Sequence, residues 1–303
     1  MSLRPRHQLQ VSNKQALSTR TALAGAAGVA IVLSILFITN RPASGPNQVI
    51  PLTGKNGELI VNSAGTILNQ YAALSSNVSA GDVAIFVNNI STLSGGSALS
   101  TNDLVLIIQM QGASINMNNS PSFGAVTHYN QAGNYEFAYV AGVTGNQIRL
   151  SCGLVHDYTV SGHTQVIRVP QYTQLTINSG ASVTAPAWNG ATGGIVAVLA
   201  QEISVAGKIE ADGKGFRGGQ RDNNTANNQR GYFYSSSSSG GEKGEGIAGY
   251  QTEYAALGAR YGRGAPANGG GGRKAHNAGR GGRAHGGSRH ARQGQGILCT
   301  PSS

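Results

Sequence analysis

Cysteine and tryptophan are scarce in this chain, whose 303 residues contain two cysteines and one tryptophan. Cys152 and Cys299 are too few for the disulfide framework of a small secreted domain, and no Cys/His spacing matches a zinc site. A single bridge between the two cysteines could form outside the cytoplasm. We expect instead that Cys152, next to an apolar run, is buried and free.

Acidic residues are absent from both ends of the chain. Residues 1–41 contain five Lys or Arg and residues 254–303 contain eight, whereas residues 42–253 contain nine together with all twelve Asp and Glu. The net charge of +10 therefore resides in two end segments, and the middle is mildly acidic. The net positive charge of the whole chain is therefore no evidence that it binds nucleic acid.

Catalytic motifs are also lacking. No serine lies in a nucleophile elbow. Four residues could form a metal or acid/base site but share no motif spacing: His128, His156, Asp157 and His163. A solenoid enzyme that cleaves polysaccharide needs clustered carboxylates, and the nearest set is Glu202, Glu210 and Asp212, with Glu202 and Glu210 expected on one outward face. We therefore expect a protein that is not an enzyme and needs no cofactor.

An apolar tract follows the basic leader, from Ala22 to Thr39. As a helix its roughly 18 residues would span about 27 Å, close to a hydrocarbon core of ~30 Å. Four cations precede it, which predicts a cytoplasmic leader and an extracytoplasmic remainder. Residues 1–41 are thus predicted to be a leader and an uncleaved signal-anchor helix in the membrane. A cleaved signal, which would give a secreted protein, remains the alternative.

Residues 42–64 are rich in Pro, Gly and Asn and are predicted to be a linker. Short apolar or alternating runs follow at residues 83–87, 104–108, 135–139, 147–150 and 165–169. These runs and their turns predict an all-β fold, with a sandwich-like or barrel-like module over residues 65–170.

Residues 171–219 carry a repeat. Leu175-Thr-Ile177 and Val183-Thr-Ala185 flank one tight turn, and Ile203-Ser-Val205 and Ile209-Glu-Ala211 flank another. The first halves lie 28 residues apart and the second halves 26. This period predicts the start of a β-solenoid, although the same strands could simply extend the sandwich.

Glycine dominates the end of the chain, with 24 of the 45 glycines in residues 213–303. Such composition buries little apolar surface, so we predict a disordered Gly/Ser/Arg-rich tail over residues 220–303. Four residues with side-chain oxygens surround the Gly-rich loop at the start of this region and are candidate calcium ligands: Asp212, Asp222, Asn223 and Asn224. Ordinary turn chemistry explains the same residues equally well.

Several strings, in order, resemble the N-terminal module of large secreted, glycine-rich, adhesin-like surface proteins of bacteria: VSAGDVAIFV, TNDLVLIIQMQGA, GNYEFAYVAGVTGNQIRL, TQVIRVPQYTQLTI, GASVTAPAWNGATGGIVAV and ADGKGFRGG. The resemblance covers about residues 70–272. It implies an extracellular, β-rich, non-enzymatic module, and it supplies no catalytic residues.

The chain departs from this pattern at its end. Members of the family continue into further domains, whereas the last thirty residues here carry Arg, Ala and His among the glycines. Glycine codons read one base out of register give Ala or Arg. We hypothesise that a frameshift near Gly272 truncates the chain, in which case it could be a fragment without a function of its own.

Function is predicted most simply as structural or adhesive, at the cell surface, with glycans as possible partners. Trp188 and Tyr172 are the candidate ligand-binding residues, since aromatic faces stack on sugar rings; Trp188 could equally be a core residue. RGG sequences occur at Arg217 and Arg280, and RNA-binding RGG segments pair cations with stacking aromatics. No nucleic-acid partner is expected, because no aromatic follows Tyr261 and the chain is predicted to be exported. The alternative is a β-solenoid enzyme that acts on polysaccharide.

Overall fold

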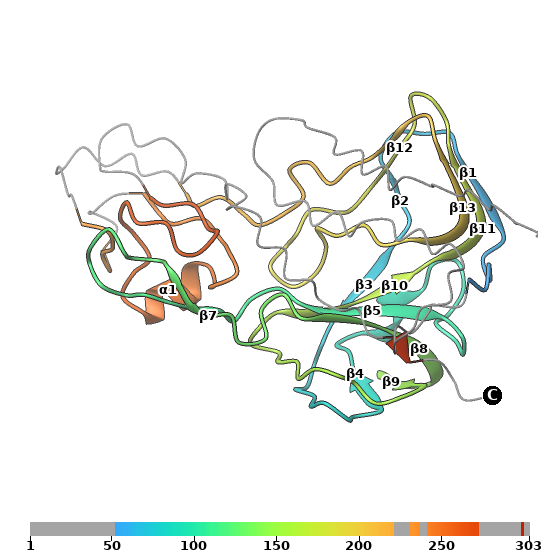
Figure 1. Cartoon of the computed structure of the whole chain (residues 1–303), viewed down its shortest axis with the longest axis horizontal. Helices are drawn as coiled ribbons and strands as arrows, with labels where there is room; N and C mark the ends of the chain where they lie inside the picture. The colour runs from blue at the N-terminus through green and yellow to red at the C-terminus, as the bar shows by residue number, and fades with distance from the viewer. Residues whose placement is uncertain (1–51, 221–230, 237–240, 273–297, 300–303) are drawn as a thin grey trace, which may run out of the picture.

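The computed structural model describes residues 52–220, 231–236 and 241–272, together with the strand at 298–299 (Figure 1). These residues form strands, a 3₁₀ turn η1 (Ile90–Leu93) and one short helix, α1 (Gln251–Ala256), so the predicted all-β fold is confirmed. Across the described ranges, no helix combines the length and apolarity that a bilayer crossing requires. The predicted membrane helix at residues 22–39 lies outside the described residues.

Six strands form one antiparallel sheet in the order β3-β10-β5-β8-β9-β4. Their bounds are β3 (Gln70–Ala73), β4 (Ala84–Phe86), β5 (Leu104–Gln109), β8 (Tyr135–Thr144), β9 (Gln147–Leu150) and β10 (Thr164–Val169). The two ends of this order meet at a bridge between Leu74 and Val87, where Ser75 N–H donates to the Phe86 carbonyl at 2.8 Å. The sheet therefore closes on itself as a small barrel.

The central strands of the barrel are buried on both faces, which explains their continuous apolar runs. In β5, Val105 and Ile107 point into the barrel core, whereas Leu104, Leu106 and Ile108 point outward into a second core. The second core lies between the barrel and the segment that contains Trp188 and Ile195.

Beside the barrel lie two three-stranded parallel sheets, in the orders β1-β11-β13 and β2-β12-β14. Their strands are β1 (Glu58–Val61), β2 (Thr66–Ile67), β11 (Gln171–Ile177), β12 (Ser182–Thr184), β13 (Leu199–Val205) and β14 (Lys208–Ile209). Each pair of consecutive strands is one solenoid rung. Leu59, Leu175 and Ile203 stack in register and pack in the solenoid core.

The predicted repeat is thus confirmed, but the first rung was missed. The interpretation of residues 42–64 as a linker is wrong at Glu58–Val61, which form β1. The whole barrel is inserted between β2 and β11. A search for a short repeat period cannot detect a rung that lies 116 residues from its neighbour, as the pairing of Glu58 with Gln174 shows.

The glycine-rich segment is also folded where the structure describes it, so the predicted disorder is wrong for residues 231–236 and 241–272. This part packs against the excursion between β5 and β8 that carries β6 (Ser114–Ile115) and β7 (Val126–His128). We call residues 231–236, 241–272 and this excursion the Gly-rich unit. It lies at one end of the molecule, opposite β1, β11 and β13 (Figure 1).

Glycine serves close packing in this unit. A Cβ at Gly269 would lie 2.5 Å from the Gly244 carbonyl oxygen, and one at Gly272 would clash with the Gly241 carbonyl. Backbone therefore packs on backbone, as shown by the hydrogen bond from Gly244 N–H to the Gly270 carbonyl at 2.6 Å. The high glycine content, which we had interpreted as flexibility, instead allows the backbone of this unit to be buried.

Cys152 is disulfide-bonded, so the expectation of a free thiol was wrong. The other cysteine of the sequence, Cys299, lies in β15 (Leu298–Cys299), whose backbone pairs in parallel with β8 at Phe137 and Ala138. Proximity to an apolar run did not predict the bond, because pairing depends on a strand that comes from far along the chain.

Candidate functional site

Trp188 does not form the predicted aromatic ledge. Its side chain is only 3% exposed, its indole N–H donates to Glu245 Oε1 at 2.9 Å, and its ring meets Phe216 edge-to-face at 6.1 Å. Tyr172 is half-buried against the separate solenoid core. The structure therefore assigns Trp188 to the core, and the two residues do not share a surface.

The structure describes only one of the four calcium candidates. Asp212 is exposed, and Asp222, Asn223 and Asn224 lie outside the described residues. Where the chain is described, no cluster of three or more His, Cys, Asp or Glu side chains could hold a metal ion. His163 instead lies 3.7 Å from Glu253, and Asp157 accepts the backbone N–H of Ala80.

The carboxylates Glu202 and Glu210 belong to different parallel sheets. Glu202 lies in β13, whereas Glu210 directly follows β14, so the expected shared face was wrong. Glu202 instead aligns with Gln174 of β11, which aligns with Glu58 of β1. Glu58 could not be found from the sequence, since it lies on the rung that the barrel insertion separates from the others.

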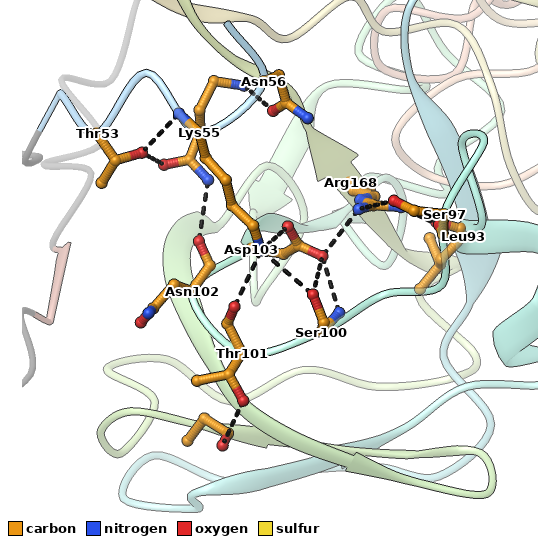
Figure 2. Close-up of polar contacts among 12 residues, drawn as sticks. Thr53, Lys55, Asn56, Leu93, Ser97, Ser100, Thr101, Asn102, Asp103 and Arg168 are labelled. Atoms are coloured by element: carbon orange, nitrogen blue, oxygen red, sulfur yellow. Dashed lines mark hydrogen bonds and ion pairs between the residues drawn. The ribbon is translucent and has the colours of Figure 1, made fainter.

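A buried ion-pair cluster joins the start of the solenoid to the barrel (Figure 2). Asp103, 2% exposed, accepts from Lys55 Nζ at 2.6 Å and from Arg168 Nη2 at 2.9 Å. It also accepts the backbone N–H of Ser100, and Arg168 donates to the Ser97 carbonyl at 2.7 Å. Two cations thus share the single carboxylate of Asp103, and the cluster fixes the start of the solenoid to the barrel.

A second buried carboxylate, Glu245, ties the Gly-rich unit to the core. It is 2% exposed and accepts five hydrogen bonds: one each from Gln111 and Trp188, and three from the backbone and guanidinium of Arg217. The guanidinium of Arg217 also lies 4.4 Å from the centroid of the Tyr250 ring. The hydrogen bond with Glu245 raises the pKa of Arg217, so the guanidinium stays protonated.

Glu242 and Lys243 occupy the interior of the same unit. Glu242 is paired with Arg260 at 2.6 Å. Lys243, only 1% exposed, donates to the carbonyls of Tyr232, Gly262 and Gly264 at 2.6–3.0 Å. Burial lowers the pKa of Lys243 to about 7, while the three carbonyl acceptors favour its ammonium form.

Above Lys243 lies a short two-stranded ribbon that carries tyrosine and arginine. Tyr234 and Tyr261 face each other in an antiparallel bridge, and Gly264 N–H donates to the Tyr232 carbonyl at 2.8 Å. The guanidinium of Arg263 lies 4.1 Å from the Tyr232 ring centroid, and that of Arg260 lies 5.7 Å from the Tyr261 ring. We call Tyr232, Tyr234, Arg260, Tyr261 and Arg263 the tyrosine–arginine ribbon.

The ribbon is accessible yet firmly supported. Its three tyrosines and Arg260 are half-buried, and Arg263 is exposed. Between Tyr232 and Tyr234, Phe233 packs on Phe123 with ring centroids 5.4 Å apart. Half-buried rings on a fixed backbone can bind a flat, partly apolar ligand with little loss of conformational entropy.

Sequence reasoning missed this site. Its residues lie in the strings GYFYSS and GARYGRG, inside the segment that was predicted to be disordered. The interleaving of aromatic and Arg residues was the available signal. It went unused because the glycines around it were interpreted as flexibility.

No protein-family model and no curated protein sequence matches the chain. Among solved structures, similarity is found to the gp54 tailspike of Acinetobacter baumannii bacteriophage AP22, in complex with A. baumannii capsular saccharide (14% identity, 42% of this chain and 29% of that one, TM-score 0.22). Two tailspikes of Pseudomonas phages also match. They are gp49 of phage LKA1 (15% identity, 43% and 27% covered, TM-score 0.22) and gp61 of phage phi297 (11%, 51% and 23%, 0.24).

The aligned part spans less than a third of each tailspike chain. At TM-scores this low, the likeness assigns neither a ligand nor a reaction to this chain.

Proposed function

We propose that this chain is an exported, non-enzymatic module that binds saccharide at the cell surface through the tyrosine–arginine ribbon. The observation that carries the proposal is the ribbon itself: three half-buried tyrosines on a two-stranded backbone, with Arg263 exposed beside them. Tyrosine offers a ring face for stacking and a hydroxyl for hydrogen bonding at low entropic cost. This combination suits a sugar ring, which has apolar faces and a polar edge.

Export is supported by the basic leader and the apolar tract at residues 22–39. The cell-surface location is supported by the resemblance to adhesin-like modules. Two interior clusters also support a binding role over a catalytic one, because the carboxylates Asp103 and Glu245 are both held by buried ion pairs. Neither is placed to exchange a proton with a ligand.

The direct test is a glycan array probed with the purified full chain. The wild type is expected to bind, and Tyr232→Ala combined with Tyr261→Ala should weaken binding at least tenfold. Stacking of an aromatic side chain on a ring is worth roughly 1–3 kcal/mol where it is known for nucleic-acid bases. Tyr129→Ala is the matched control, because Tyr129 is 39% exposed and lies outside the ribbon. Absence of binding to any saccharide would refute the proposed function.

A second candidate, an enzyme that acts on polysaccharide, is favoured by one observation. Glu58 and Glu202 align on either side of Gln174 across three parallel strands, so their Cα atoms lie about 10 Å apart. The two carboxyl groups of an inverting glycosidase lie about 6.5–9.5 Å apart, a separation that two side chains on strands this far apart can adopt. Turnover of a polysaccharide that disappears in both Glu58→Gln and Glu202→Gln would support this candidate over the first.

A further inference from the structure

Charge pairing distinguishes Arg263 from Arg217 and Arg260. Arg217 is paired with Glu245 and Arg260 with Glu242, and both carboxylates are buried. The remaining carboxylate of residues 241–272, Glu253, lies nearest to His163. Within the described part of the chain, Arg263 has no carboxylate partner; its guanidinium contacts only the Tyr232 ring among the charged and aromatic groups.

A second unneutralised cation lies directly beneath the ribbon. The Lys243 ammonium is bound by the carbonyls of Tyr232, Gly262 and Gly264, which flank Arg263, and it lies 4.5 Å from the Phe123 ring. In the described residues no carboxylate forms an ion pair with it. Arg263 is therefore an exposed positive charge without local compensation, and Lys243 reinforces it below about pH 7, where its ammonium is protonated.

The geometry of Arg263 selects among anions. Its planar guanidinium presents parallel N–H donors that match a carboxylate, and the stacking on Tyr232 holds this plane next to a ring face. A ligand that carries a carboxylate on a sugar ring would use both features at once. A nucleic acid would need a longer track of cations for its phosphates, and the described ribbon provides only Arg260, already paired, and Arg263.

We propose that the ligand of the tyrosine–arginine ribbon is an acidic saccharide of the uronic-acid class, and that Arg263 binds its carboxylate. This inference rests on the proposed saccharide-binding function and specifies its ligand. Tyr234 and Tyr261 then contact the neighbouring sugar rings. Lys243, when protonated, attracts the carboxylate electrostatically from the interior of the unit.

The experiment compares oligomers of galacturonate, alginate and hyaluronate with their methyl esters, which keep the rings but lose the charge. Binding of the full chain is measured at two salt concentrations. At least one free acid is expected to bind about tenfold more tightly than its ester, as a charge-assisted hydrogen bond implies. Arg263→Gln should abolish this difference, and Arg263→Lys should restore part of it. Arg149→Gln, an exposed arginine of β9, is the control and should change nothing.

The possible outcomes separate the two proposals. Equal binding of acid and ester would overturn the acidic ligand and leave saccharide binding intact. Binding of neutral saccharides alone would do the same. Equally tight binding of a single-stranded oligonucleotide would overturn the inference in favour of a general anion surface. Failure of every saccharide on the array would refute the function on which the inference rests.

Discussion

The indole N–H of Trp188 donates a hydrogen bond to Glu245 Oε1 at 2.9 Å, although the two residues lie 57 positions apart. Trp188 packs in the core between the barrel and its neighbouring segment, and Glu245 lies in the Gly-rich unit. This bond and the Arg217 ion pair therefore fix the position of the glycine-rich segment on the β core. Because the segment is fixed, its tyrosines and arginines can form a binding surface.

Replacement of Glu245 should release the Gly-rich unit. Glu245→Ala leaves the Arg217 guanidinium and the Trp188 indole without their acceptor. Because Arg217 is 39% exposed and can turn to water, the expected loss of stability is about 1–3 kcal/mol, the cost of a buried donor left without a partner. Chemical denaturation followed by tryptophan fluorescence measures this change, since Trp188 is the single tryptophan. Glu202→Gln, at an exposed position, should change stability by less than about 0.5 kcal/mol. Equal stability of the two variants would contradict the role of Glu245.

Replacement of Gly269 tests whether glycine serves packing or flexibility. Gly269→Ala would place a Cβ 2.5 Å from the Gly244 carbonyl oxygen, and forced overpacking costs roughly 1–3 kcal/mol. Gly142→Ala is the control, because nothing lies within 4 Å of a Cβ at that position. Limited proteolysis should cleave residues 241–272 faster in Gly269→Ala alone. A Gly269→Ala protein as resistant as the wild type would indicate a flexible segment.

Lys243 should make stability depend on pH. Burial lowers its pKa to about 7, below the unfolded value near 10.4. Below pH 7 both states hold the proton; between pH 7 and about 10 the unfolded state binds more protons than the folded state. Stability should therefore rise with pH across this window, up to the point where buried tyrosines with raised pKa, such as Tyr71 and Tyr254, begin to reverse the trend.

Urea denaturation at pH 6.5, 7.5, 8.5 and 9.5 measures the effect. Lys243→Met should flatten the slope in this range, whatever its effect on absolute stability. The same slope in wild type and variant would show that Lys243 does not titrate there.

The membrane anchor is tested by fractionation of cells and sequencing of the mature N-terminus. The tract from Ala22 to Thr39 lacks a good cleavage site, so the chain is expected in the membrane fraction with its leader intact. A soluble product that starts between Ala43 and Gln48 would instead support a cleaved signal and a secreted protein.

Local sequence patterns were sufficient for five of the six antiparallel strands, with β3 missed, and for two of the three rungs. Alternation in Tyr135-Glu-Phe137 and the turns near Gly180 and Gly207 report on contacts between neighbours in the chain, and the structure confirms these strands. The rung at Glu58–Val61 could not be found in this way, because its partner strand begins at Gln171. Closure of the barrel through Leu74 and Val87 was likewise undetermined between sandwich and barrel.

The site was harder to predict than the fold. Trp188 could be exposed or buried as far as the sequence shows, and its packing in the core and its hydrogen bond to Glu245 decide for burial. In the Gly-rich unit, the glycine content led to a wrong prediction of disorder, because glycine at positions such as Gly269 allows backbone to pack on backbone. Burial of Glu242, Lys243 and Glu245 within that unit depends on partners that no local pattern reveals.

Hydrogen exchange of the full chain, measured with and without a saccharide that the glycan array has identified as a ligand, tests the central claim most directly. If the tyrosine–arginine ribbon is the binding site, the added protection should centre on residues 231–236 and 260–264, and it should disappear in Tyr232→Ala combined with Tyr261→Ala. Protection centred on β1, β11 and β13, around Glu58 and Glu202, would contradict this assignment and place the ligand on the outer face of the solenoid.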